Sequence, residues 1–307
     1  MTNSHYDVVI IGGGPAGLTA GLYTARARLK SLLIEKGLVG GQIANAELVE
    51  NFPAFPDGIG GIELGERIHQ QATKYGLKTT TAEVTGLKIQ KDKKIVRTTE
   101  GDFTARAIII AGGSQWQKLG VPGEEEFTGK GVSYCATCDA PFFTEQSVAV
   151  VGGGDAAITE AMYLTKFAAK VTVIHRRDQL RATRILQERA FAEPKIDFRW
   201  DTTVDGIDGE DFVKRLRLNN VRTGRKSTLE VNGVFVAIGF KPDTGYLKGI
   251  VPLDAAGHVI TNEKMETEIP GIYAAGDIRS NSGRQAITAA GDGATAAIYA
   301  EKYLSES

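Results

Sequence analysis

Two stretches of the chain share one order of apolar and polar positions. Residues 6–11 (YDVVII) and 147–151 (SVAVV) form apolar runs that each end in a cluster of glycines. A helical pattern follows each cluster, at 18–28 and up to residue 169, and a further apolar run follows at 31–34 and 171–174. Short apolar runs bounded by glycines are typical of strands buried in a parallel sheet. The pattern predicts an α/β fold in which a β-α-β unit occurs twice.

The first glycine cluster reads GGGPAG at 12–17 and matches the dinucleotide-binding pattern G-x-G-x-x-G between a strand and a helix. We expect Gly12 to allow the tight turn, Gly14 to admit a pyrophosphate and Gly17 to let the helix pack on the strand. Glu35 ends the next strand 23 residues after Gly12 and suits a ribose hydroxyl. A loop that only turns the chain would not need this whole order of elements.

A second copy of the pattern begins 140 residues later. It reads GGGDAA at 152–157, the G-x-G-x-x-A variant, with Gly152, Gly154 and Ala157 at the patterned positions. The sequence therefore predicts two dinucleotide sites.

The two copies differ at the end of the strand that follows the helix. The position equivalent to Glu35 holds His175, and Arg176, Arg177 and Arg181 follow it. Cationic side chains suit a ribose 2′-phosphate, whereas an acid suits a free 2′-hydroxyl. A solvated charged face at the start of a helix is the alternative, but the register with Glu35 favours NADP over NAD.

The only two cysteines are Cys135 and Cys138, in a C-x-x-C spacing. This spacing lets two sulfurs form or open a disulfide without moving the rest of the chain. Zinc would need about four ligands, and neither a second C-x-x-C nor a histidine pair of suitable spacing is present. A disulfide across so short a loop would constrain the unfolded chain little. We therefore expect a redox dithiol and no metal site.

Composition narrows the class of partner and the number of domains. A length of 307 residues favours two domains. A net charge of −1 offers no electrostatic basis for binding nucleic acid or an anionic membrane. We find neither a secretory segment nor a run of about 20 apolar residues. A cytoplasmic location is expected, where a lone C-x-x-C is more typical of catalysis than of a structural disulfide.

In combination, these features resemble the low-molecular-weight thioredoxin reductases over nearly the whole chain. The motifs that carry the resemblance are GGQ at 40–42, ENFP at 50–53, AGG at 111–113, CATCD at 135–139, H-R-R-x-x-x-R at 175–181, FVAIG at 235–239, AAGD at 274–277 and RQA at 284–286. Several of these motifs are flavoprotein-like when taken singly, whereas all of them in this order are specific to the family. The chain departs from the commoner pattern at Gly112 and Gly283, where many relatives have threonine and tyrosine.

The resemblance implies two Rossmann-like three-layer nucleotide-binding domains. Residues 1–114 and 244–307 would form a discontinuous FAD-binding domain, and the inserted residues 115–243 an NADPH-binding domain that carries the dithiol. Segments 120–123 and 241–245, rich in glycine and proline, are expected to be the crossover linkers. Two crossovers form a hinge, so domain rotation would present the dithiol and the nicotinamide to the flavin in turn.

The residues implied to contact FAD come from both segments of its domain. They are Glu35 and Val84 for the adenosine half, Gln42 and Asn51 for the flavin region, Gly276 and Asp277 for the ribityl or phosphate part, and Arg284, Gln285 and Ala286 for the isoalloxazine and its ribityl arm. A turn at Asn51 and a helix cap at Gln285 are the structural alternatives.

The resemblance also implies an electron relay from NADPH through FAD and the dithiol to a protein disulfide. Cys138 would contact the flavin, and Cys135 would attack the substrate through a mixed disulfide. Asp139 would transfer the thiol proton, although an acid in this position also suits a helix start.

Thioredoxin or a similar small redox protein is the implied partner, and the chain is expected to form a homodimer. A reductase of a glutaredoxin-like protein would use the same internal chemistry. A dithiol oxidase that passes electrons to oxygen shares the motifs and remains an alternative. A ferredoxin-dependent enzyme would be expected to lack the second glycine loop and the basic cluster, which are both present.

Overall fold

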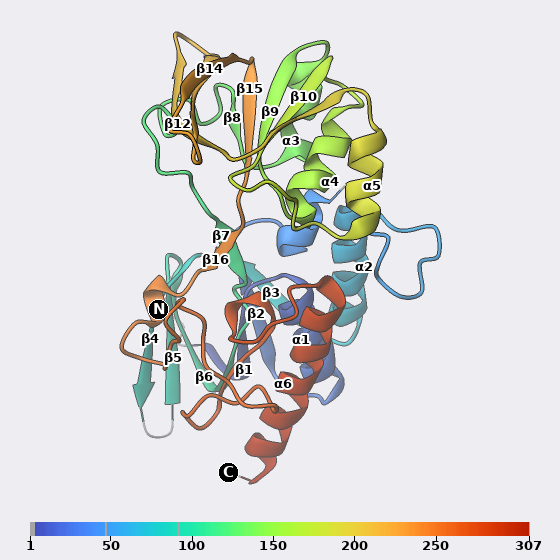
Figure 1. Ribbon diagram of the computed structural model, residues 1–307. Coiled ribbons are helices and arrows are strands. Elements are labelled where there is room, and N and C mark those ends of the chain that lie inside the picture. Colours follow the sequence, from blue (N-terminus) through green and yellow to red (C-terminus); the bar gives the residue numbers. More distant parts are fainter. Residues whose placement is uncertain (1–3, 47, 91–92, 307) are drawn as a thin grey trace. The chain divides into compact units, whose positions relative to one another are not determined.

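The computed structural model describes residues 4–46, 48–90 and 93–306. The chain divides into two compact units, unit 1 of Met1–Gln115 and Lys241–Ser307 and unit 2 of Trp116–Phe240. Strands β7 (Ser114–Trp116) and β16 (Phe240–Pro242) pair in a two-stranded sheet at the two points where the chain passes between the units (Figure 1).

Segment 120–123, expected as a crossover linker, lies inside unit 2. Gly123 has a φ of +88°, and a Cβ there would lie 2.0 Å from the carbonyl oxygen of Ile207. The Ile207 N–H donates to the Pro122 carbonyl at 2.9 Å. The glycines and proline of segment 120–123 therefore form a turn that packs on a neighbouring strand. The expectation of a linker here is wrong.

Unit 1 is built on a seven-stranded mixed sheet in the order β3-β2-β1-β6-β5-β4, with β17 also paired to β6. The strands are β1 (Ser4–Ile11), β2 (Ser31–Glu35), β3 (Lys78–Thr81), β4 (Val84–Gln90), β5 (Lys93–Thr98), β6 (Gly101–Ile110) and β17 (Ile272–Ala274). Strands β3, β2, β1, β6 and β17 pair in parallel, so their carboxyl ends share one edge of the sheet.

Both faces of this sheet are covered, which explains the unbroken apolar run in β1. Val8 and Ile10 belong to an apolar cluster that includes residues of α1 (Pro15–Arg26) and α6 (Ala286–Glu306). Val9 and Ile11 belong to the cluster on the opposite face. Alternate side chains of a strand point to opposite faces, and each buried side chain of this size contributes about 1.5–3 kcal/mol.

Further short elements complete unit 1. They are α2 (Gly61–Lys74), η1 (Gly41–Asn45), η3 (Gly245–Leu247) and η4 (Gly276–Ile278). Helix α2 buries Leu64 and Ala72 on its inner face.

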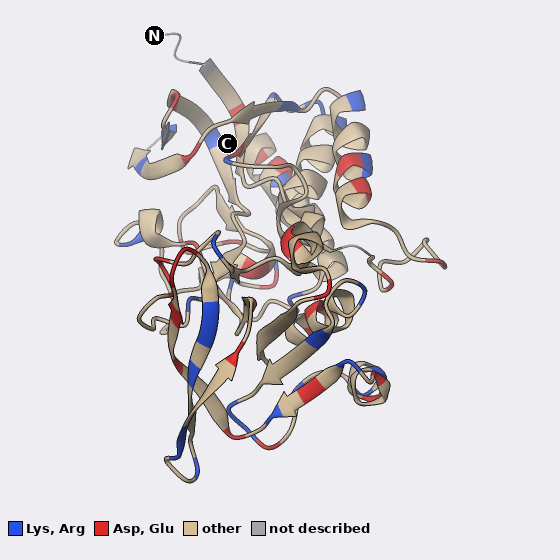
Figure 2. Cartoon of the chain, turned by 90° about the horizontal axis from the view of Figure 1, so that it is seen from above, with Lys and Arg blue, Asp and Glu red and all other residues tan. Residues whose placement is uncertain are grey.

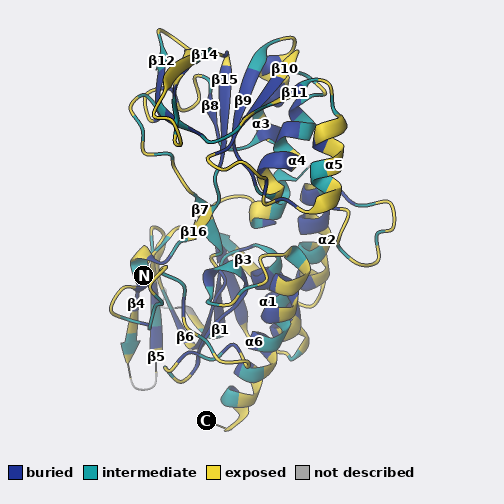
Figure 3. Ribbon diagram, viewed as in Figure 1, coloured by how far each residue is buried: buried dark blue, intermediate teal, exposed yellow. Residues whose placement is uncertain are grey.

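Unit 2 contains a five-stranded parallel sheet in the order β11-β10-β9-β15-β8. Its strands are β8 (Val132–Ser133), β9 (Ser147–Gly152), β10 (Lys170–Ile174), β11 (Ile196–Arg199) and β15 (Gly233–Ala237). Helices α3 (Ala136–Asp139), α4 (Asp155–Leu164) and α5 (Arg184–Ala192) share one apolar cluster with these strands. Figure 3 shows β8, β9 and β15 as buried strands within this unit.

The opposite face of this sheet is covered by a three-stranded antiparallel sheet. Its strands are β12 (Thr202–Gly209), β13 (Val213–Asn220) and β14 (Lys226–Glu230). In the hairpin of β13 and β14, Leu216 is fully buried against the parallel sheet. The hairpin of β4 and β5 likewise buries Leu87 and Val96. One face of each hairpin therefore completes an apolar core.

The second helix ends earlier than its pattern suggests. The helical run expected up to residue 169 stops at Leu164. The Lys195 ammonium donates to the carbonyl oxygens of Thr165 and Ala168 at 2.8 and 3.0 Å, which supplies partners for carbonyls past the end of the helix. A lysine from a distant segment therefore stabilises the turn. The apolar pattern of the helix does not predict this contact.

Charges of opposite sign lie close together on the molecule, and Figure 2 shows both signs on many elements. On the basic strand β13, Arg215 and Arg217 pair with Asp208, and Lys214 pairs with Glu210. In the described part of the chain, no helix is long and apolar enough to cross a membrane.

Both units thus repeat the β-α-β arrangement on a parallel sheet, and unit 2 is inserted into unit 1 in sequence. The predicted α/β fold with two Rossmann-like domains is confirmed.

Candidate functional site

The first glycine loop combines two crowded positions with one open position. Gly12 has a φ of +104°, and a Cβ there would lie 2.3 Å from the carbonyl oxygen of Ala111. A Cβ at Gly17 would lie 1.8 Å from the carbonyl oxygen of Gly12. At Gly14, which precedes α1, no heavy atom would lie nearer than 4.0 Å. The loop leaves room for a group at the start of α1, where free backbone N–H groups favour a phosphate.

Glu35 is held directly against this loop. Its Oε2 accepts a hydrogen bond from the Gly13 N–H at 2.6 Å, and its Oε1 accepts one from the Gly37 N–H at 2.8 Å. The carboxylate is therefore fixed at the end of β2, beside the open position of the loop. Val84, the other residue expected near adenosine, begins β4 and is half-buried against an apolar cluster on one face of the sheet.

Amide side chains from three separate motifs make hydrogen bonds at exposed positions of unit 1. Asn51 donates from Nδ2 to Oε1 of Gln285 at 3.0 Å, across 234 positions of sequence. Gln42 donates from Nε2 to the Ser114 carbonyl at 3.1 Å and accepts from Asn45 at 3.2 Å. The structure brings Asn51 and Gln285 together and leaves their amides accessible to a ligand.

The turn after β17 positions Gly276 and Asp277. Gly276 has a φ of +77°, a conformation that favours glycine. Asp277 accepts a hydrogen bond from the Ser282 hydroxyl at 3.0 Å, and burial raises the pKa of its carboxyl. The Arg284 N–H donates to the same hydroxyl at 3.1 Å, and Ala286 begins α6. Arg284 itself has a φ of +52°. Residues other than glycine rarely adopt this backbone conformation.

Sequence reasoning missed the acid that fixes this turn. Asp292 of α6 is buried and accepts from the Arg279 Nε at 2.7 Å and from the Gly276 N–H at 3.1 Å. A second bond from Arg279 makes the ion pair bidentate, the strong geometry for arginine and a carboxylate. The one signal in the sequence was Asp292 itself, a charged residue among the small residues of the first part of α6.

In unit 2, Cys135 and Cys138 form a disulfide at the start of α3. The Cys138 N–H donates to the Cys135 Sγ at 3.2 Å, and the Asp139 N–H donates to the Cys135 carbonyl at 3.2 Å. Cys138 is exposed, whereas Cys135 and Asp139 are half-buried. An N–H directed at Sγ favours a thiolate at Cys135 once the disulfide opens.

A buried acid anchors the segment that leads to the dithiol, and sequence reasoning missed it too. Glu124 is 3% exposed and accepts from the Tyr134 hydroxyl at 2.8 Å. The same carboxylate accepts from the N–H groups of Leu119 and Gly120 at 2.8 and 2.7 Å. Burial raises the pKa of Tyr134, so its hydroxyl stays a donor. The residue before Cys135 is therefore tied to the body of unit 2.

The second glycine loop repeats the geometry of the first. Gly152 has a φ of +156°, and a Cβ there would lie 2.3 Å from the Ala237 carbonyl oxygen and 2.6 Å from the Ala157 Cβ. A Cβ at Gly154, which precedes α4, would meet no atom within 4 Å. This loop also leaves room for a phosphate group at a helix start.

The basic cluster beside this loop is made of three exposed arginines around a buried histidine. His175 is 4% exposed, and a Cβ at Gly153 would lie 2.4 Å from its Nδ1. Burial, followed by the charge of Arg181, lowers the pKa of His175. The imidazole is thus neutral at neutral pH, and the positive charge comes from Arg176, Arg177 and Arg181, which are exposed.

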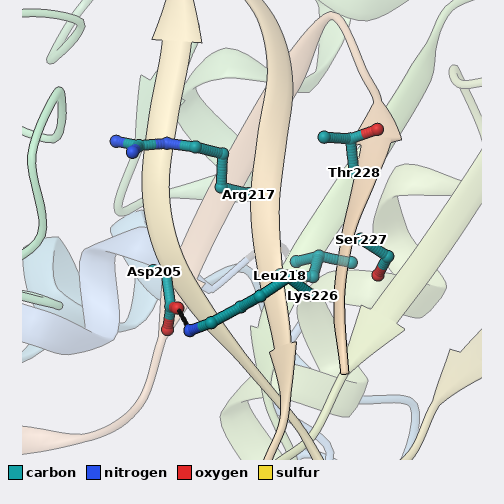
Figure 4. Close-up of a pocket in the computed structure, with 6 residues that line it drawn as sticks. All are labelled: Asp205, Arg217, Leu218, Lys226, Ser227 and Thr228. Atoms are coloured by element: carbon teal, nitrogen blue, oxygen red, sulfur yellow. Dashed lines mark hydrogen bonds and ion pairs between the residues drawn. The ribbon is translucent and has the colours of Figure 1, made fainter. Parts of the chain in front are cut away.

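One surface hollow of about 580 Å³ lies apart from these sites, on the three-stranded sheet (Figure 4). Its lining consists of Asp205, Arg217, Leu218, Lys226, Ser227 and Thr228. Lys226 pairs with Asp205, and Arg217 pairs with Asp208, so each charged residue of the lining has a partner of opposite sign. No group of three metal-ligating acids, histidines or cysteines occurs within the described ranges.

Comparison with known proteins agrees with this set of sites. The family model described as pyridine nucleotide-disulphide oxidoreductase matches residues 6–293. A thioredoxin reductase of Bacillus subtilis (strain 168) is 47% identical over 98% of this chain and 95% of its own length. The structure of Lactococcus lactis thioredoxin reductase superposes with a TM-score of 0.96 at 44% identity, covering 98% of this chain and 100% of that one.

A more distant solved structure, thioredoxin reductase of T. acidophilum, has a TM-score of 0.92 at 32% identity and covers 97% of this chain and 98% of its own. The similarity therefore spans both units and both glycine loops. The chain belongs to the low-molecular-weight thioredoxin reductases within the pyridine nucleotide-disulphide oxidoreductase family.

Proposed function

We propose that this protein uses NADPH to reduce a disulfide of thioredoxin through FAD and the Cys135–Cys138 pair. One observation carries the proposal: a single chain joins a disulfide at the start of α3 to two glycine loops that each leave an open position at a helix start. Bound FAD would accept electrons from NADPH and deliver them to the disulfide.

Unit 1 is the proposed FAD domain. The open position at Gly14 fits a pyrophosphate, and Glu35 lies beside it with both oxygens fixed by backbone N–H groups. Such a carboxylate is oriented to accept from ribose hydroxyls. The amides of Asn51 and Gln285 are proposed to contact the flavin, and Asp277 the ribityl or phosphate part. The pKa of Asp277 is raised by burial, and a hydrogen bond to a bound hydroxyl would compensate for part of that cost.

Unit 2 is the proposed NADPH domain. The second loop offers the same open position at Gly154. Arg176, Arg177 and Arg181 would bind the 2′-phosphate, since exposed guanidinium groups pair well with phosphate oxygens. His175 supports the loop from below through its contact with Gly153 and is not proposed as a cation.

The dithiol would reduce the partner by exchange. The Cys135 thiolate attacks one sulfur of the partner's disulfide, forms a mixed disulfide and displaces the other sulfur as a thiolate. Cys138 then attacks Cys135, which re-forms the internal disulfide and releases the second partner thiol. Two electrons leave the protein, and two protons are taken up by the partner. Asp139, hydrogen-bonded through its N–H to Cys135, is proposed to transfer the proton at the dithiol.

The nature of the acceptor decides between this function and its alternatives. NADPH consumption should be followed with purified thioredoxin, with a glutaredoxin-like protein and with oxygen alone. Rapid turnover with thioredoxin and slow turnover with oxygen is the expected result. Preference for the glutaredoxin-like protein would change the proposed partner, and rapid oxygen consumption without a disulfide acceptor would identify a dithiol oxidase.

A homodimer and a cytoplasmic location complete the proposal. Exposed apolar side chains of unit 1, including Leu48 and Ile62, would supply contact area to a second copy. A dithiol that cycles between oxidised and reduced forms suits a compartment where thiols are kept reduced. Sedimentation equilibrium tests the dimer, for which a single species of monomer mass is the contrary result.

A further inference from the structure

The Tyr246 hydroxyl in η3 is buried and has no hydrogen-bond partner within the described part of the chain. Burial, followed by the charge of Asp243, raises the pKa of Tyr246. The phenol is therefore protonated at every physiological pH and presents a donor. Buried tyrosine hydroxyls nearly always find a partner, so an unpartnered one in a nucleotide-binding domain points to a ligand.

The hydroxyl lies at the edge of the sheet where the parallel strands end. A Cβ at Gly112, just past β6, would lie 3.7 Å from the Tyr246 hydroxyl oxygen and 3.4 Å from Ile278. Gly112 in turn borders the first glycine loop, because a Cβ at Gly12 would lie 2.8 Å from its Cα. The lack of a side chain at 112 leaves the path between the hydroxyl and the loop unobstructed by that residue.

Neighbouring groups assign the hydroxyl to the adenosine side of the loop. Tyr246 packs in the same apolar cluster as Val84. Asp243, whose charge acts on Tyr246, pairs with Lys36 at 2.9 Å. Lys36 directly follows Glu35 in the chain. The hydroxyl therefore lies among the residues that surround the expected ribose and adenine.

We propose that the Tyr246 hydroxyl donates a hydrogen bond to the adenosine half of bound FAD and so helps to select an adenine dinucleotide. The proposal rests on the proposed function of unit 1 as an FAD domain. It adds a positioning residue that none of the glycine or acid motifs contains.

Tyr246→Phe removes only the hydroxyl and tests the proposal on the full-length protein. FAD should dissociate about tenfold more readily, the effect expected for one buried hydrogen bond. Binding of FMN, which lacks the AMP half, should be unchanged. The flavin-free variant should melt at the same temperature as the wild type or higher, since an unpartnered buried hydroxyl is removed.

Tyr273→Phe is the matched control. The Tyr273 hydroxyl is also in unit 1 but donates to the Tyr299 carbonyl at 3.0 Å. Its loss should lower the melting temperature of the flavin-free protein and leave the FAD dissociation constant unchanged. The two variants therefore give opposite patterns if Tyr246 serves the ligand and Tyr273 serves the fold.

The outcomes separate this inference from the function on which it rests. If the wild type binds FAD and Tyr246→Phe binds it equally well, the inference is wrong and the proposed function stands. Equal losses of FAD and FMN affinity would also contradict it, because the hydroxyl would then not serve the adenosine half. A wild-type protein that binds no FAD would overturn the proposed function and the inference together.

Discussion

Asn51 and Gln285 are joined by a hydrogen bond of 3.0 Å from Nδ2 to Oε1, although 234 positions separate them in the chain. Asn51 follows α1 and β2, and Gln285 directly precedes α6, so the bond connects the two sequence segments of unit 1. Both side chains are exposed. An exposed amide pair gains little stability by itself, which favours a role in holding a ligand.

Asn51→Ala should accelerate flavin release several-fold with little change in melting temperature, because the lost contact is exposed in the ligand-free chain. Gln285→Ala should do the same, and the double variant should show less than the product of the two effects. Release is followed by the rise in flavin fluorescence. Asn262→Ala is the control, since Asn262 is also in unit 1 but pairs with Glu266 at 2.8 Å. Fully multiplicative effects would mean that the pair does not act as a unit.

Removal of a single arginine of the basic cluster should weaken the binding of NADPH and leave the binding of NADH unchanged. For Arg177→Ala or Arg181→Ala, we expect KM for NADPH to rise about tenfold, the loss of one charge-assisted hydrogen bond. KM for NADH should stay constant, since NADH lacks the 2′-phosphate. Arg222→Ala, an exposed arginine that pairs with Asp201 elsewhere in unit 2, is the control. An equal rise in KM for NADPH and NADH would show that the cluster does not bind the 2′-phosphate.

Glu160 predicts a pH dependence of the stability of unit 2. Burial raises the pKa of its carboxyl to about 8, and its Oε2 has no hydrogen-bond partner in the described chain. In the unfolded chain the carboxyl ionises near pH 4.3. Between these values the folded form binds more protons, so the contribution to stability is greatest below the unfolded pKa and is lost as pH rises towards 8.

Glu160→Gln removes this ionisation. Its melting temperature should match that of the wild type near pH 5 and exceed it by a few °C at pH 8 to 9. Thermal melts at four pH values from 5 to 9 measure the difference. Glu188→Gln, at an exposed position of α5, is the control. A constant offset at all four pH values would show that the charge of Glu160 is not involved.

The sequence predicts those features that depend on residues close together in the chain. The two glycine loops, Glu35 and the dithiol each follow from a short motif in a fixed context, and the fold class follows from apolar runs buried on two faces. Contacts between distant segments leave no such pattern. The pairs Asp292–Arg279 and Glu124–Tyr134 join residues that no periodicity connects.

Burial also changes the charge expected of one residue in the predicted basic cluster. His175 occupies the position equivalent to Glu35, yet its ring lies against Gly153 and its pKa is lowered. A one-dimensional register gives the place of a residue but not its environment. The charge of an imidazole depends on that environment.

The roles of the two cysteines can be separated by substitution. Cys135→Ser should still allow NADPH to reduce the flavin, since neither glycine loop is altered, but reduction of thioredoxin should be lost. Asp139→Asn should slow dithiol turnover about 100-fold, within the range of general acid–base catalysis, without changing NADPH binding. Wild-type rates of thioredoxin reduction in Cys135→Ser would contradict its role as the attacking thiol.

Rapid mixing of the oxidised protein with NADPH, followed by oxidised thioredoxin, tests the central claim most directly. The flavin absorbance band should bleach on addition of NADPH and recover on addition of thioredoxin, with one thioredoxin disulfide reduced per NADPH consumed. A band that recovers with oxygen as fast as with thioredoxin, or that responds to NADH as readily as to NADPH, would contradict the account.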